Sequence, residues 1–328
     1  MRIPTPIQAL SAAAAITLLV GCSGSSAFAP KPASPHSGAR HLMGQPLAGY
    51  YSCPATGSIE YVSDFKNNII NVYAGKFAGQ APCGQIGSGL PNNPQELFDQ
   101  TVTHDLYVAN MGGNNVLVFH RGQMTPYNTY TDPSAQDPED VTVAPDGTVI
   151  ASNQTSADFL EAGSISTWIG GPNGGTFVGN FPMMKDLEGL SVTVKKNGTI
   201  YYSDEDRRSD HGALWSLMCP AGACGIQTRV FVDFLSPTGL AFDDTGDLLA
   251  VDETKFTADT FELPNPRPSK FPLAGDPIGL AISNSDHHLF STELINNDAA
   301  EYSYPSGVLI GKVPGNPGGD PAGIAVDP

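Results

Sequence analysis

An internal repeat constrains the fold of this chain more than any other feature. A segment that begins with Pro or Leu and continues with small and apolar residues occurs six times, at residues 94–99, 138–143, 187–192, 237–243, 277–282 and 321–327. A second apolar segment that ends in a polar residue follows five of them, at residues 106–110, 148–153, 199–204, 248–252 and 289–293. Third apolar runs follow in several units, for example at 116–119, 164–168 and 213–217. Repeats of this kind predict a β-meander of about four strands, which is one blade of a β-propeller.

Turn residues separate the first and second apolar runs of several units. The pairs at these positions are Asp146-Gly147, Asn197-Gly198 and Thr245-Gly246. An Asn-Gly or Asp-Gly pair between apolar runs is typical of a two-residue β-hairpin turn in which both central residues have positive φ. We therefore expect the first two strands of each blade to form a tight hairpin.

The two ends of the repeat region are incomplete in complementary ways. Residues 59–64 and 69–73 match second and third strands but have no first strand before them, whereas residues 321–327 match a first strand with nothing after it. One blade is therefore expected to combine strands from both termini, which closes the ring and leaves no open sheet edge at that point. The predicted fold is an all-β, six-bladed β-propeller over residues 50–328.

The composition agrees with an all-β chain and limits its partners. The 328 residues include 36 Gly and 28 Pro, which supply turns, and 40% hydrophobic residues, which can fill a core. The formal net charge is −17, with 33 Asp and Glu against 16 Lys and Arg. This balance argues against nucleic acids and anionic membrane surfaces as partners, because phosphate binding needs clustered Lys and Arg. It favours cations or neutral ligands, although acidity also keeps an exported protein soluble.

Residues 1–22 are typical of an export signal. Arg2 provides a positive start, and residues 7–20 form an apolar stretch that is too short to span a bilayer as a helix. The stretch ends in Leu-Val-Gly-Cys, which resembles the lipobox of bacterial lipoproteins, in which the Cys, here Cys22, becomes the acylated first residue. Cleavage after Ala29 is the alternative, although Pro30 just beyond that bond is unfavourable. Both interpretations export the protein.

Residues 23–49 are rich in Ser, Pro, Ala and Gly and show no apolar periodicity. This composition predicts a flexible linker between a membrane anchor and the propeller. In the lipoproteins that the segment resembles, a seryl residue after the acylated Cys, here Ser23, goes with the outer membrane. We therefore expect a monomer of the cell envelope that is attached to the outer membrane only through its lipid. Secretion is the alternative.

Four cysteines remain once Cys22 is set aside, an even number in an oxidising compartment. They are Cys53, Cys83, Cys219 and Cys224, and three pairings are possible. A disulfide between Cys219 and Cys224 is the most economical, because a short turn between two strand-like runs separates them; Cys53–Cys83 then follows. The C-x4-C spacing and the absence of a neighbouring His argue against a zinc site at these thiols.

The repeat pattern resembles known families. The pattern P-x-G-[LI]-A-[FVI]-D, then a turn, then L-x-V-x-[DN], is similar to NHL repeats and to the related SMP-30/gluconolactonase-like six-bladed propellers, over residues 50–328. The match is strongest at residues 237–252 and 321–327. It departs from the pattern where Glu96 and Asp140 replace the motif Gly. Gly at this position lets crowded inner strands approach one another near the central channel.

One face of the ring carries most of the candidate functional residues. Because the strands are antiparallel, the start of each innermost strand and the end of each second strand lie on the same face. Carboxylates and amides dominate these positions and the loops just beyond them. The predicted ligand-binding face contains Asp64, Gln95, Asn110, Asp204, Asp206, His211, Asp252 and Glu293.

Three further residues of this face form a candidate metal site. Glu139 and Glu188 occupy equivalent strand starts in neighbouring blades, with Asn153 near them. An all-oxygen set of carboxylates and amides is what Ca²⁺ selects. The resemblance to SMP-30-type lactonases also implies a divalent metal at the channel mouth, held by Glu, Asn and Asp. The alternative is that strand-end Asp and Asn side chains only hydrogen-bond the backbone of turns.

Histidines give weaker signals for function. His211 beside Glu205 and Asp206 could form an acid–base set, as in propeller lyases of the streptogramin-inactivating type, but a His beside acids in a charged loop is more often solvated. His104 and the pair His287-His288 fall in turns between first and second strands, on the opposite face. The sequence shows no complete catalytic constellation.

The sequence therefore predicts a non-catalytic binding or scaffold propeller. Its acidic face would hold a peptide, a glycan, a small molecule or a partner protein. The alternative function is that of a divalent-metal-dependent hydrolase or lyase. Ca²⁺ or another divalent cation is the one cofactor that the sequence suggests.

Overall fold

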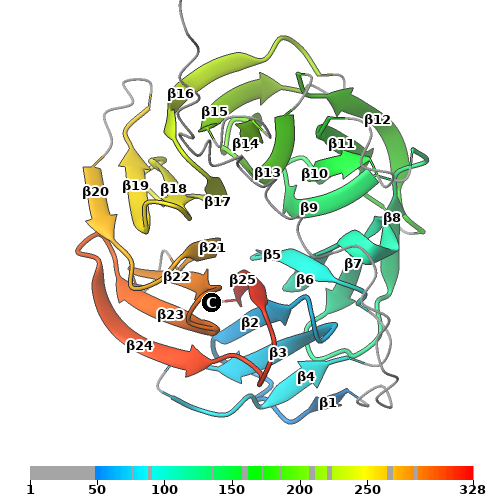
Figure 1. The fold of residues 1–328 in the computed structure, drawn as a ribbon. Coiled ribbons are helices and arrows are strands. Elements are labelled where there is room, and N and C mark those ends of the chain that lie inside the picture. The colour runs from blue at the N-terminus through cyan, green and yellow to red at the C-terminus, as the bar shows by residue number, and fades with distance from the viewer. Residues whose placement is uncertain are drawn as a thin grey trace, which may run out of the picture. The chain divides into compact units, whose positions relative to one another are not determined.

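Six antiparallel sheets surround a central axis in the computed structural model (Figure 1). The structure describes residues 49–75, 77, 79–87, 91–134, 136–156, 162–171, 173–184, 187–206, 211–219, 224–263, 269–283 and 287–327. The predicted six-bladed β-propeller is confirmed. Cys22, the predicted export signal and the predicted linker up to residue 48 lie outside the described residues. No helix of the described residues is long and apolar enough to cross a membrane.

Each blade is a meander, and the strand that begins each repeat lies nearest the axis (Figure 1). Blade 1 consists of β25 (Pro321–Asp327), β2 (Ile59–Asp64), β3 (Ile69–Ala74), β4 (Gly84–Ile86) and β1 (Tyr50–Tyr51). Blade 2 consists of β5 (Pro94–Gln100), β6 (Asp105–Asn110), β7 (Asn115–His120) and β8 (Asn128–Thr131), with the short 3-10 helix η1 (Met111–Gly113) after β6. Blade 3 consists of β9 (Gln136–Val143), β10 (Thr148–Ser156), β11 (Ser164–Ile169) and β12 (Thr176–Pro182).

The remaining three blades follow the same plan. Blade 4 consists of β13 (Leu187–Val194), β14 (Thr199–Asp206), β15 (His211–Met218) and β16 (Thr228–Phe234). Blade 5 consists of β17 (Pro237–Phe242), β18 (Leu248–Asp252), β19 (Thr257–Phe261) and β20 (Ser269–Pro272). Blade 6 consists of β21 (Pro277–Ser283), β22 (His288–Glu293), β23 (Asp298–Ser303) and β24 (Val308–Pro314).

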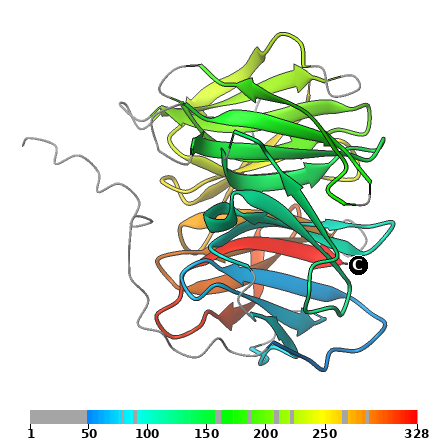
Figure 2. The same cartoon turned by 90° about the vertical axis from the view of Figure 1, so that its right-hand side faces the viewer.

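Blade 1 combines both ends of the propeller, as the sequence predicts. Strand β25 pairs antiparallel with β2, in a register that places Ile324 opposite Val62 and Asp327 opposite Ile59. In Figures 1 and 2 the red C-terminal strand lies beside blue β2. All seven residues of β25 are buried, so ring closure removes this strand from solvent. A fifth strand, β1, which the repeat pattern does not predict, pairs with β4 at the outer edge of the blade.

Both expected disulfides are present, Cys53–Cys83 and Cys219–Cys224. Cys53 follows β1 and Cys83 precedes β4, so the first disulfide ties the added edge strand to blade 1. The second closes the short loop after β15.

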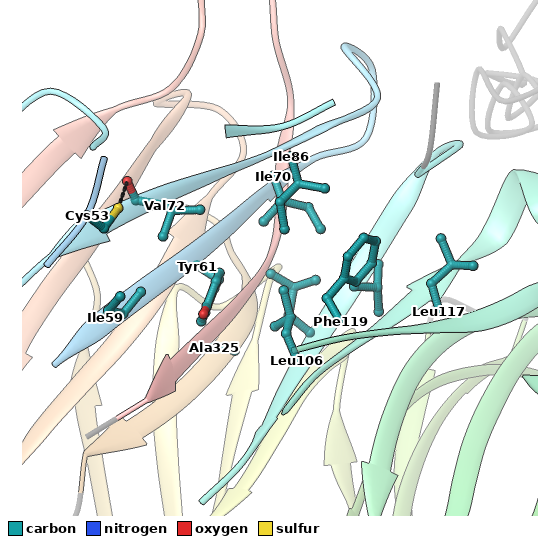
Figure 3. Close-up of a cluster of buried hydrophobic side chains, with 12 residues drawn as sticks. Cys53, Ile59, Tyr61, Ile70, Val72, Ile86, Leu106, Leu117, Phe119 and Ala325 are labelled. Carbon is teal, nitrogen blue, oxygen red and sulfur yellow. Dashed lines mark hydrogen bonds between the residues drawn. The ribbon is translucent and has the colours of Figure 1, made fainter. Parts of the chain in front are cut away.

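The hydrophobic core consists of six clusters, each shared by two neighbouring blades. The cluster between blades 1 and 2 contains Ile59, Tyr61, Leu106 and Phe119 (Figure 3). Side chains alternate along a strand, so Leu106 joins this cluster while its neighbour Tyr107 joins the next one, between blades 2 and 3. Every blade thus stabilises both of its neighbours.

The hairpin turns correct one expectation. Gly147, Gly198 and Gly246 have φ of 86°, 84° and 90°, but the residues before them do not have positive φ. The Ala144 N–H donates to the Thr148 carbonyl, and the Gly147 N–H donates to the Ala144 carbonyl. The loop is therefore three residues long, a turn with one left-handed Gly at its end. The expectation of a two-residue turn is therefore wrong. The loop has one residue more, and in this longer loop only the Gly has a positive φ.

Candidate functional site

The face that carries the starts of the innermost strands, here called the strand-start face, is assembled as the sequence predicts. Pro94 pairs with Asn110, Pro237 with Asp252 and Pro277 with Glu293, which places the start of each first strand beside the end of its second strand. The opposite face, here called the hairpin face, carries the turns that join first and second strands.

Most strand-end residues of the strand-start face are buried and hold loops in place. Asp64, Asn110, Asn153, Asp252 and Glu293 are each at most 2% exposed. Asp64 Oδ1 accepts the backbone N–H of Asn67 at 3.0 Å and of Asp320 at 3.2 Å. The Asp252 carboxylate accepts the Leu235 N–H at 3.1 Å. These contacts are the turn-capping role that the sequence leaves open as an alternative, and contact with a ligand stays a prediction for these residues.

Asn110, Glu293 and Asn153 have similar structural contacts. The Asn92 N–H donates to Asn110 Oδ1 at 2.6 Å, and Lys312 Nζ donates to Glu293 Oε2 at 2.5 Å. The Asn153 amide nitrogen donates to the hydroxyls of Ser164 and Ser166 at 2.9 Å and 2.8 Å. The amide nitrogen of Asn153 thus serves blade 3 itself. Gln95 is also buried and lies 3.6 Å from the Met111 sulfur.

Glu139 and Glu188 form the centre of an acidic group on the strand-start face. Glu139 Oε2 is buried and has no hydrogen-bond partner. Burial raises the pKa of Glu139 to about 8, and the charge of Glu188 is the next largest cause. The two residues therefore lie near enough for their charges to interact, and their role as metal ligands stays a prediction.

Two further carboxylates extend this group across blades 4 and 5. Glu205 pairs with Glu188 across β14 and β13, and the Ser236 hydroxyl lies 2.7 Å from Glu205 Oε2 and 3.2 Å from Glu253 Oε2. The charge of Glu253 also raises the pKa of Glu139. We call Glu139, Glu188, Glu205 and Glu253 the acidic mouth. Because Ser236 has one hydroxyl proton, it can donate to only one of the two carboxylates at a time.

The two acids that replace the motif Gly reach into the central channel. Asp140 Oδ2 accepts the Ser191 hydroxyl at 2.6 Å and the Val192 N–H at 2.7 Å, both from blade 4. Glu96 Oε1 accepts the Leu280 N–H of blade 6 at 3.1 Å. The two side chains therefore tie inner strands of different blades together. The repeat pattern marks both positions as departures but does not show this role.

Glycines on the facing strands leave room for Glu96. A Cβ atom added to Gly279 or Gly323 would lie 2.7 Å or 2.8 Å from Glu96 Oε2, closer than real Cβ contacts. Burial, followed by the charge of Asp140, raises the pKa of Glu96 well above its usual range. Burial also raises the pKa of Asp140 to about 7, although its hydrogen bonds oppose this shift. Two buried acids this close favour a state in which at least one holds a proton.

A cavity of about 310 Å³ extends from these two acids to the turns of the hairpin face. Its walls mix aliphatic residues of the inner strands with polar residues such as Asp99, Thr142 and Lys196. The channel-lining aliphatic residues are Leu97, Val141, Val192, Leu240, Leu280 and Ile324. A cavity of this size with both apolar and polar wall residues is large enough for a small molecule.

A separate hollow of about 190 Å³ lies in blade 4 and contains three predicted face residues, Asp204, Asp206 and His211. His211 is exposed and pairs with Asp206 across β15 and β14. Burial raises the pKa of Asp204 to about 7. Side chains alternate along β14, so Glu205 projects to the opposite side of the sheet from Asp204 and Asp206, toward Ser236.

Comparison with known proteins supports the fold and does not assign a family. No protein-family model and no curated protein matches the sequence. The fold is similar to solved structures of a nidogen/laminin complex (14% identity, TM-score 0.62, 82% of this chain and 98% of that chain) and of a streptogramin B lyase (13%, 0.58, 84% and 86%). It is also similar to regucalcin, a calcium-binding protein from Agrobacterium tumefaciens (12%, 0.52, 71% and 77%).

At these identities the similarity shows the fold alone. The chain is a six-bladed β-propeller with an acidic mouth on one face and a cavity along its central axis.

Proposed function

We propose that this chain is an exported, membrane-tethered binding propeller whose acidic mouth holds Ca²⁺, and that its ligand binds at this ion. The observation that carries the proposal is Glu139 Oε2, a buried carboxylate oxygen with no hydrogen-bond partner beside the like charge of Glu188. A buried carboxylate without a hydrogen bond is costly, and a cation between two carboxylates removes both the repulsion and the lost hydration. Oxygen ligands from carboxylates are those that Ca²⁺ selects.

The acidic mouth would leave part of the coordination sphere of the ion open. Within the described residues, no third carboxylate or imidazole converges with Glu139 and Glu188 into a set of ligand atoms within 4.8 Å. Ca²⁺ takes six to eight oxygens, so water or oxygens of a ligand would complete the sphere. A sugar or peptide with neighbouring oxygens could supply the missing ligand atoms. This arrangement favours a binding function over a catalytic one.

Thermal unfolding of the metal-stripped protein tests the proposal. If only the folded protein binds Ca²⁺, a concentration ~100 times the dissociation constant stabilises it by about 2.7 kcal/mol. Glu188→Gln should abolish most of the rise in melting temperature. The matched control is Asp146→Asn, which should retain the rise. Asp146 lies in an exposed turn on the hairpin face, where its Oδ1 accepts the Thr148 N–H. A melting temperature that ignores Ca²⁺, Mg²⁺ and Mn²⁺ alike would overturn the proposal.

The hollow of blade 4 favours a second function, that of a hydrolase or lyase. Burial raises the pKa of Asp204 to about 7, and an exposed imidazole, His211, lines the same hollow. A carboxylate with a pKa near 7 is suited to general base catalysis. Turnover of a panel of lactones that is lost in His211→Ala and retained in Glu188→Gln would support this function in place of simple binding.

A further inference from the structure

Three side chains converge on the hairpin face, far from the acidic mouth in the fold. They are Asp99 in β5, His104 in the turn after β5, and Asp327 at the end of β25. One nitrogen or oxygen atom of each lies within 4.8 Å of the others. Asp327 belongs to blade 1 and the other two residues to blade 2, so only the closed ring assembles the group.

The carboxylate of Asp99 provides a second, independent observation, because it lacks a partner. It is 6% exposed, and neither of its carboxylate oxygens has a hydrogen-bond partner. Buried carboxylates are ordinarily paired. Asp105, a buried acid at the start of the next strand, follows that rule, since His120 Nδ1 lies 2.7 Å and the Tyr127 hydroxyl 2.9 Å from its oxygens.

Asp327 and His104 are placed as a second and a third ligand. The Asp327 side chain is fully buried, and its Oδ2 accepts a hydrogen bond from Arg121 Nη1 at 2.5 Å. Its Oδ1 is hydrogen-bonded to His104 Nδ1 at 2.6 Å, a contact that a bound ion would replace. The charge of Arg121 offsets one of the two negative charges of Asp99 and Asp327. The group then has a net charge of −1, which a divalent cation can balance. The His104 side chain is 45% exposed, so an ion can reach the group from solvent.

We propose that Asp99, His104 and Asp327 bind a divalent transition-metal cation, and that Zn²⁺ suits the group best. One imidazole nitrogen and two carboxylate oxygens are ligands that Zn²⁺ takes, with a water at the fourth position. Ca²⁺ and Mg²⁺ prefer oxygen ligands only, so this site and the acidic mouth differ in the ion they select. The proposal does not depend on the proposed function at the mouth.

The bound ion would link the two ends of the propeller and reach the central cavity. Asp327 is the last described residue of the chain, and the ion would fasten it to blade 2. Asp99 also lines the cavity of about 310 Å³. The open position of the ion is therefore next to the cavity, where a ligand with a carboxylate or another anionic oxygen could complete the coordination.

Calorimetric titration of the metal-stripped, full-length chain with Zn²⁺ tests the site. We expect one Zn²⁺ per chain, bound in the presence of excess Ca²⁺. His104→Gln should weaken this binding tenfold or more, and Asp99→Asn, which keeps the size of the side chain, should weaken it similarly. His120→Gln is the matched control, because His120 lies on the same face and also pairs with an Asp, Asp105, but belongs to no described group of three possible ligands. The Zn²⁺ affinity of this variant should equal that of the parent.

Two results would overturn the inference. One is the absence of stoichiometric Zn²⁺ binding by the parent protein, and the other is equal Zn²⁺ affinity in His104→Gln and the parent. The Glu188→Gln variant separates the two proposals, since it should lose the Ca²⁺ response of the mouth and keep the Zn²⁺ site. Circular dichroism of each variant confirms that the propeller remains folded.

Discussion

Replacing Glu139 with Gln should stabilise the metal-free propeller, and the gain should grow with pH. The folded protein holds the pKa of Glu139 at about 8, against an ordinary value of 4.5. Between these values the folded state binds a proton that the unfolded state has lost. The stability contributed by this proton is complete below about pH 4.5 and is lost as the pH rises through about 8. Because Gln cannot ionise, the variant should not lose stability in this way as the pH rises.

The size of the effect follows from the shift. One pKa unit corresponds to about 1.4 kcal/mol. Because pH 7 lies about 2.5 units above the ordinary pKa of 4.5, the upper limit at pH 7 is about 3.4 kcal/mol. Water that enters the mouth weakens the repulsion, and we expect Glu139→Gln to be more stable than the parent by about 1 to 3 kcal/mol at pH 7.

Urea unfolding in the presence of a chelator, at several pH values from 5 to 8, measures this difference. The parent should lose stability faster than the variant by as much as about 1.4 kcal/mol per pH unit. Added Ca²⁺ should raise the free energy of unfolding of the parent and leave that of the variant unchanged. Parallel stability curves for the two proteins would refute the argument that Glu139 is a buried, repelled carboxylate. Asp146→Asn, in an exposed turn, should follow the parent at every pH.

Three other changes test the ring, the channel and the export signal. Deletion of residues 321–328 removes a strand whose residues 321–327 are all buried, so cooperative thermal unfolding should be lost; a truncated chain that melts like the parent would contradict ring closure by β25. Gly279→Ala places a Cβ 2.7 Å from Glu96 Oε2 and should cost about 1 to 3 kcal/mol in urea unfolding, whereas Gly179→Ala, which has open space, should cost much less. Cys22→Ser should release the protein from membranes or block its processing in cell fractionation, and unchanged fractionation would favour the secreted alternative.

The strand order and the blade count follow from local patterns in the sequence. Each strand pairs with the next one along the chain through a short turn, so the apolar runs and turn residues of one unit suffice to predict its meander. The repeat pattern predicts even the composite blade, because residues 59–64 have no first strand before them and residues 321–327 supply one. The fifth strand, Tyr50–Tyr51, has only two residues and is too short to give a pattern of its own.

The turns and the strand-end side chains show where local patterns stop being sufficient. The sequence predicts an Asp-Gly turn but not its length, because one residue more or less changes which positions need positive φ. The pattern likewise places Asp64 and Asp252 on the strand-start face. It does not show that loops from neighbouring segments use their carboxylates as caps, because those loops carry no repeat.

The sequence by itself determined the class of fold and the closure of the ring, since both depend on strands and turns that recur along the chain. It favoured one of three cysteine pairings, and the structure showed that pairing to be the one present. Only the tertiary structure decided which side chains meet across the ring. Glu96 bonds to Leu280, 184 residues away, and His104 contacts Asp327 across 223 residues. The physical reason is that these contacts join different blades, and the distance between two blades is set by the closed ring and not by any pattern within one repeat.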